Sequence, residues 1–148
     1  MAGTLWNDGD RAAILSRFDR LRPDARPRWG SLDAPRMVTH VTDALRAGLE
    51  EVTLTPLPGP LHYWPINTLV MFHLPWPKGA PTAPELLSRP PAEWHEEITM
   101  LKATVARFVE RDIDGKWPIH VAFGRITGRD WGQLMYRHMD HHLVQFSA

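Results

Sequence analysis

The sequence predicts a single all-α domain, a four-helix bundle with a long crossover connection between its second and third long helices. Four segments repeat apolar residues three and four positions apart, as one face of a helix requires. Ten of the fourteen prolines lie between residues 56 and 91, where they interrupt regular structure. The chain has 148 residues, enough for one domain, so residues 1–148 are treated as one unit.

The first two helices are expected before the proline-rich segment. Apolar residues recur at helical spacing over residues 8–21, and Asn7 provides a start signal. A second helix is predicted over residues 34–52, with Asp33 as a good N-cap. His40 lies beside the apolar stripe of this second helix.

The segment over residues 56–91 is predicted to be an ordered connection. It carries apolar and aromatic residues, with a short buried helix expected over residues 67–74 and a loop over residues 75–85. Connections this long are uncommon in compact domains and usually have a role. We expect this one to cross the length of the bundle or to cover a site.

Two more long helices are predicted after the connection. The third runs over residues 91–112, with glutamates in its first turns, where the helix dipole favours negative charge. The fourth runs over residues 128–146, and Thr127 with Asp130 three residues on is close to a capping box. Its predicted inner face carries apolar residues and histidines.

The composition excludes several classes of protein. The formal net charge is zero, so the composition does not require a basic surface of the kind that binds nucleic acid. The first residues lack the features of a signal peptide, and no apolar stretch is long enough to cross a bilayer. The absence of cysteine removes disulfides and thiolate metal ligands. We therefore expect a cytoplasmic protein that binds neither nucleic acid nor a membrane.

The histidines of the last helix give the strongest functional signal. His138 and His142 are four residues apart, so their side chains share one face of a helix. Two imidazoles do not close a metal site alone, and His40 is the best candidate for a third ligand. Three neutral imidazoles suit a divalent transition metal and leave one position open for water or substrate. His141, three residues after His138, is the alternative to His142.

Several polar residues are candidates for the surroundings of the metal. They are expected to orient a ligand, to face a substrate or to line the mouth of the site. The alternative is that the histidines belong to an ordinary core, but burying imidazoles without partners is costly. The candidates are Asp43, His120, His141 and Gln145.

The C-terminal part of the chain resembles a known family. Residues 120–146 begin with His-Val-Ala-Phe-Gly and end with His-Met-Asp-His-His-Leu-Val-Gln-Phe. This run is similar to the ending of one branch of the DinB/YfiT-like metalloenzyme superfamily, a branch without known function. Two shorter pieces agree, Trp29-Gly-Ser-Leu with Met37-Val-Thr-His40, and Pro77-Lys-Gly-Ala-Pro-Thr82. Val121 departs from the branch, which has proline there.

The resemblance implies a DinB-like bundle, often a homodimer, with zinc or nickel held by His40, His138 and His142. Better-characterised relatives include thiol-dependent S-transferases and isomerases, in which the metal stabilises the thiolate of a low-molecular-weight thiol. A metal-dependent enzyme acting on a small molecule is therefore expected, by thiol transfer or by hydrolysis with metal-activated water. The alternatives are a metal-binding or interaction protein without turnover and a purely structural bundle.

Overall fold

The protein is all-helical in the part of the chain that its structure describes. The structure, a computed structural model, covers residues 3–80 and 82–148. Its α-helices are α1 (Asp8–Arg20), α2 (Ala34–Gly48), α3 (Ile66–Phe72), α4 (Trp94–Glu110) and α5 (Gly128–Gln145), with short 3₁₀ helices at Pro60–His62 and Pro84–Leu87. Over these residues there is no β-strand, and the all-α prediction is confirmed.

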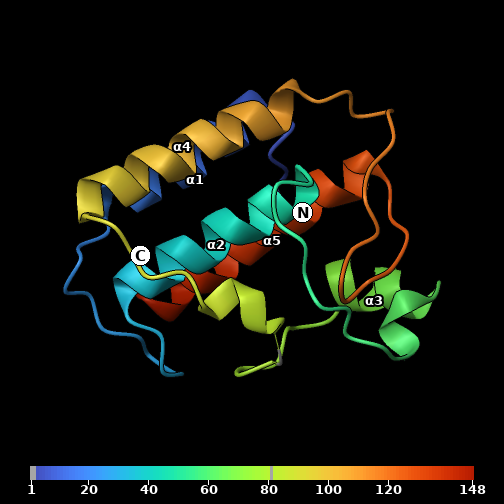
Figure 1. Cartoon of the computed structure of the whole chain (residues 1–148), viewed down its shortest axis with the longest axis horizontal. Helices are drawn as coiled ribbons and strands as arrows, with labels where there is room; N and C mark the ends of the chain where they lie inside the picture. The colour runs from blue at the N-terminus through green and yellow to red at the C-terminus, as the bar shows by residue number, and fades with distance from the viewer. Residues whose placement is uncertain (1–2, 81) are drawn as a thin grey trace.

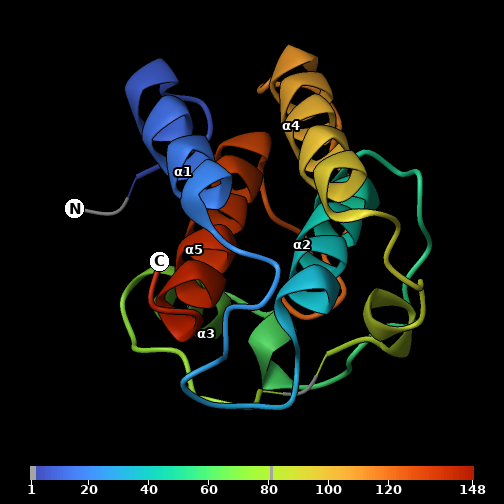
Figure 2. The same cartoon turned by 90° about the vertical axis from the view of Figure 1, so that its left-hand side faces the viewer.

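The four long helices lie side by side (Figures 1 and 2). Helix α2 packs against α4 and α5, and α1 packs against the same two helices from the other side. The apolar stripes predicted from helical spacing face one another in the interior between them. This core includes Ile14, Phe18, Met37, Val41, Leu45, Leu101, Val105, Phe108, Leu134 and Met139. None of the described helices is long and apolar enough to span a membrane.

Side-chain caps determine where three of the long helices begin. Asn7 and Asp33 each accept a hydrogen bond from the backbone N–H three residues on, at 2.9 Å. Thr127 and Asp130 form a capping box at the start of α5. Each cap satisfies N–H groups that lack a partner at a helix start. Helices α1, α2 and α5 therefore begin where the sequence predicted.

The predicted bounds of two helices were wrong. Helix α2 ends at Gly48 rather than residue 52, because Glu50 adopts a left-handed φ of 63°. The N–H groups of Glu50 and Glu51 bond to carbonyls of the last turn at 3.0 and 2.9 Å, which is a Schellman ending without its usual glycine. Helix α4 begins three residues after residue 91, because the Glu93 carboxylate caps its first N–H groups.

The connection between α2 and α4 carries the short helix predicted for it, α3. The expected burial of this helix was wrong, because only Asn67 and Met71 of α3 are buried whereas Ile66 and Leu69 are exposed. Figure 1 shows α3 on the side of the molecule away from the C-terminus. Arg137 of α5 donates hydrogen bonds to main-chain carbonyls at the end of α3, which fastens the connection to α5.

Candidate metal centre

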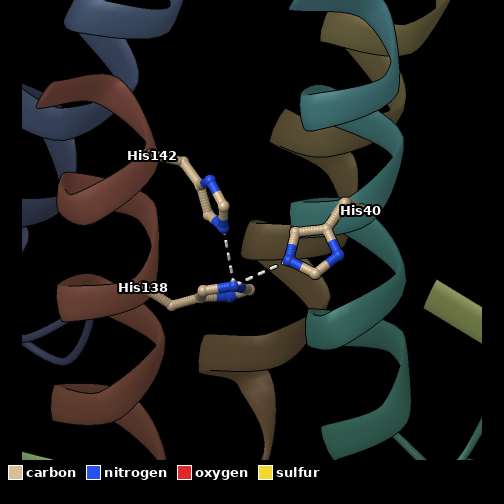
Figure 3. A group of neighbouring side chains, drawn as sticks. All are labelled: His40, His138 and His142. Atoms are coloured by element: carbon tan, nitrogen blue, oxygen red, sulfur yellow. Dashed lines mark hydrogen bonds between the residues drawn. The ribbon is translucent and has the colours of Figure 1, made fainter. Parts of the chain in front are cut away.

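Three histidines from two helices meet between α2 and α5 (Figure 3). His40 stands on α2, and His138 and His142 stand one turn apart on α5. Nε2 of His138 lies 3.0 Å from Nε2 of His40 and 3.2 Å from Nε2 of His142. One nitrogen of each ring lies within 4.8 Å of the other two. The group could hold one metal ion, and it contains His142 rather than His141.

Burial keeps the rings of this cluster neutral. His40 is buried. His138 and His142 are partly exposed as whole residues, but their rings are surrounded by protein atoms. Burial lowers the pKa of His138 well below its usual value, and the rings of His142 and His40 lower it further. Burial, and then the ring of His40, lower the pKa of His142 to about 3. Neutral imidazole is the form that binds a metal.

The outer nitrogen of His40, Nδ1, is buried and has no hydrogen-bond partner among the residues that the structure describes. Burial lowers the pKa of His40, against smaller opposing effects of the Leu86 main chain and the Asp43 charge. The Leu86 main chain thus lies close to the ring without meeting the geometry of a hydrogen bond. Placing the single N–H of the neutral ring on Nδ1 leaves the lone pair of Nε2 directed at His138.

Gln145 contacts the outer side of His142. Nδ1 of His142 lies 2.7 Å from Oε1 of Gln145, and Nε2 of Gln145 donates to the main-chain oxygen of Trp29 at 2.8 Å. The Gln145 side chain is buried. Gln145 was expected either to lie beside a metal ligand or to face a substrate, and its side chain lies beside His142.

Asp43 lies one turn after His40, but its carboxylate bonds to other residues. It accepts hydrogen bonds from Nε of Arg89 at 3.0 and 3.2 Å and from Arg46 at 3.3 Å. Arg89 also bonds to the fully buried Glu97 at 2.9 Å. Among the described residues no hydrogen bond joins Asp43 to His40, so Asp43 affects that ring through its charge. The buried ion pairs fasten the end of the connection to α2 and α4.

His120 lies outside the three-histidine cluster. Its Nδ1 accepts hydrogen bonds from the backbone N–H groups of Ala122 and Phe123 at 3.0 and 3.2 Å. Burial, and then the charge of His62, lower the pKa of His120 to about 3. The charge of His120 contributes slightly to the lowered pKa of His138. The hydrogen bonds of His120, however, stay within the turn before α5.

Two tryptophans flank the cluster, and neither was predicted from the sequence to lie there. The ring of Trp76 is centred 6.3 Å from that of His138 and 5.6 Å from that of His141. The ring of Trp29 is centred 5.7 Å from that of His141. His141 therefore contacts both indoles beside the cluster. The Trp-Gly piece of the family resemblance contains Trp29, whereas Trp76 lies just before the Pro-Lys-Gly piece, and both are in segments without regular structure.

Two surface hollows lie away from the histidines. One, of about 370 Å³, borders the start of α5, and the other, of about 380 Å³, borders α4 near His95. Neither is lined by a residue of the cluster. The convergent nitrogen atoms of the three rings define the candidate site.

The fold and the site define an all-helical protein with a three-histidine group that could hold a metal ion. A family model described as "Protein of unknown function (DUF1569)" matches residues 73–148, just over half of the chain. The chain belongs to this family. The matched part contains His138 and His142 but not His40. No curated protein and no solved structure gave a match.

Proposed function

We propose that the protein binds one divalent transition metal, zinc or nickel, through His40, His138 and His142. The approach of their Nε2 atoms, at 3.0 and 3.2 Å, carries this proposal. Lone pairs of neutral imidazoles repel at this spacing unless a proton or a cation lies between them. Zinc–nitrogen bonds of about 2.0–2.1 Å in a tetrahedral site place the ligand atoms about 3.3 Å apart. The distances from His138 to His40 and to His142 are close to that value, and the third pair lies within 4.8 Å.

A DinB-type four-helix bundle is the architecture that we propose around the metal. The packing of α2 against α4 and α5, and of α1 against the same two helices, supports it. The position of α3 within the connection between α2 and α4 agrees with the proposed crossover. The C-terminal motif with its two cluster histidines is the sequence feature that supports the family relationship.

The proposed activity is metal-dependent chemistry on a small molecule. Bound at the open position of such a site, a thiol or a water has a lowered pKa, so the metal supplies a nucleophile near neutral pH. The indoles of Trp29 and Trp76 provide apolar surface beside the proposed site, against the rings of His141 and His138. We propose transfer to or from a low-molecular-weight thiol, with hydrolysis as the other reaction, in a homodimer.

A non-catalytic metal-binding or interaction protein is the second candidate. The observation that favours it is an exposed aromatic pair before α3, where Tyr63 and Trp64 are 70% and 78% exposed. Large apolar side chains exposed together are a common feature of contact surfaces. In this function the metal would stabilise the fold while the surface beside α3 contacts a partner.

Metal content measured by mass spectrometry tests the site. We expect about one transition metal per chain in the wild type and none in His138→Ala, because two imidazoles do not close the site. His95→Ala is the matched control, since His95 is 89% exposed and its ring pairs with Glu93 rather than with a residue of the cluster. No metal in the wild type, even after reconstitution with zinc and nickel, would refute the proposal.

The same preparation separates the two candidate functions. In cobalt-substituted protein, a small thiol that binds the metal changes the visible spectrum of the metal. A changed spectrum, absent in His138→Ala, supports the enzyme. An unchanged spectrum with the metal fully bound favours the interaction protein.

A further inference from the structure

We infer that Gln145 is a positioning residue that fixes the tautomer of His142. It holds the hydrogen of the ring on Nδ1 and so keeps the lone pair of Nε2 directed at the cluster. The amide lies between His142 and the main chain of Trp29, which comes from the connection between α1 and α2. The effect on metal affinity rests on the proposed function, whereas the tautomer is a property of the metal-free protein.

The direction of these hydrogen bonds follows from the carbonyl of Trp29. A carbonyl only accepts, so the Gln145 atom 2.8 Å from it is the NH₂ group. The amide oxygen of Gln145 then faces His142 at 2.7 Å, and it also only accepts. Nδ1 of His142 therefore carries the hydrogen. A neutral imidazole has only one N–H, which leaves Nε2 without a hydrogen.

The surrounding fold leaves the Gln145 amide little freedom. Gln145 is 4% exposed, and its main-chain oxygen accepts a hydrogen bond from the N–H of Arg28 at 2.7 Å. Gly30 follows Trp29 with a φ of +80°, and a Cβ at this position would lie 2.9 Å from Nε2 of Gln145. The absence of a side chain at Gly30 thus leaves the space that the amide occupies.

A fixed tautomer matters because an imidazole binds a metal through a nitrogen that carries no hydrogen. A hydrogen-bond partner on the other nitrogen sets the tautomer and the ring orientation, and losing that partner typically lowers metal affinity about 10- to 100-fold. His142 has such a partner, whereas the described part of the chain provides none for the corresponding buried nitrogen of His40. We therefore assign to Gln145 the orientation of one ligand of the proposed site.

Long-range ¹H–¹⁵N NMR spectra of the metal-free protein test the inference. They distinguish a ring nitrogen that carries a hydrogen from one that does not, at about pH 8, where histidine is neutral. Gln145→Met keeps the length of the side chain and removes both hydrogen bonds. Gln145→Glu keeps an acceptor for His142 and loses the donor to Trp29. Gln133→Met, on the solvent-accessible part of α5, is the matched control.

We expect the hydrogen of His142 on Nδ1 in the wild type, Gln145→Glu and Gln133→Met, and a shift to Nε2 in Gln145→Met. Zinc affinity is expected to fall about 10- to 100-fold in Gln145→Met and much less in the other two variants. A role in packing alone predicts the opposite order, because methionine preserves the volume and glutamate buries a charge.

A wild-type spectrum with the hydrogen on Nε2, or an unchanged tautomer in Gln145→Met, would overturn the inference. If Gln145→Met does not fold, Gly30→Ala displaces the same amide from the Trp29 side, and an unchanged His142 tautomer there also overturns it. A wild type with the hydrogen on Nδ1 that binds no zinc or nickel keeps the role of Gln145 and refutes the metal site. The two hypotheses therefore fail separately.

Discussion

The cluster histidines bind protons less readily than a histidine in water does. Burial is the main cause for His138 and for His142, and each ring also disfavours a charge on its neighbour. In the unfolded chain the same residues have pKa values near their ordinary value of about 6.5. Below that pH the unfolded chain therefore binds more protons than the folded chain does.

We expect the metal-free protein to lose stability as the pH falls below about 6.5. Stability increases with pH wherever the unfolded state binds more protons, and the folded pKa of His142 is about 3. The contribution of His142 is thus fully present above the unfolded pKa and declines as the pH falls toward 3. Urea unfolding between about pH 7 and pH 5, above the range in which exposed carboxylates titrate, measures this decline.

His142→Gln is the control for that measurement, because glutamine does not titrate. The free energy of unfolding should depend less on pH in this variant than in the wild type. Equal slopes in the two proteins would show that the folded pKa of His142 is not lowered.

Single residues of the site could be predicted where the signal is local in the sequence. The four-residue spacing of His138 and His142 predicts a shared helix face, and the structure brings them together with His40. Asp43 illustrates what spacing does not reveal. Its partner Arg89 lies 46 residues away, and only the tertiary fold shows that the Asp43 carboxylate bonds to Arg89.

At the scale of helices, the group formed by Asp43, Arg89 and Glu97 joins α2, α4 and the end of the connection. Glu97 is fully buried, and Arg89 is its charged partner at 2.9 Å. Removing one member of a buried ion pair leaves a charge without compensation, which costs far more than losing a surface pair. This group therefore contributes strongly to the packing of α4 on α2.

We expect Arg89→Met to lower the free energy of unfolding by about 3–5 kcal/mol. Lys102→Met is the matched control, since Lys102 pairs with Asp19 where both side chains are exposed, at 42% and 49%. Surface pairs contribute at most about 1 kcal/mol. Urea denaturation of both variants measures the difference. Equal losses of unfolding free energy in the two variants would contradict the prediction. They would show that the backbone N–H of Ala92, which also donates to Glu97, is enough to stabilise the buried carboxylate.

Helix starts were more predictable than helix ends. Asn7, Asp33 and Thr127 are side chains whose chemistry caps the next turn, so the sequence itself marks the starts. The end of α2 depends on Glu50, a residue type that seldom takes a left-handed conformation. A glycine would have marked this position in the sequence.

At the scale of the whole molecule, a metal at the cluster would link α2 to α5. These helices also contact each other directly, and α5 fastens α3 through Arg137. Because the ligands come from two helices, the unfolded chain has no preformed site. Metal binding and folding are therefore expected to be coupled.

We expect zinc to raise the melting temperature of the wild type by about 5–10 °C when free zinc is about 100-fold above its Kd. Binding to the folded state alone contributes about 2.7 kcal/mol at that ratio. A domain of this size gains about 2–4 °C for each kcal/mol. Scanning calorimetry measures the shift, and a chelator should reverse it. A shift of equal size in His138→Ala would mean that zinc binds elsewhere.

The course of the long connection was the least predictable part of the molecule. Proline content indicates that the connection is irregular but not where it runs. The contacts of Trp76 with His138 and His141 depend on its indole N–H bonding to Val70 and on Arg137 lying over its ring. None of these partners follows from local spacing. The sequence could therefore suggest that the connection covers a site, but it could not show which residues of the connection lie there.

The distance along the chain between the cluster histidines also sets when the site can be completed during protein synthesis. His40 precedes His138 by 98 residues. At about 5–20 residues per second, a ribosome adds His138 about 5–20 s after His40. Throughout that interval the nascent chain holds one of the three imidazoles. A metal ion that needs all three imidazoles would therefore enter only after His142 has been added, as a step that follows the synthesis of nearly the whole chain.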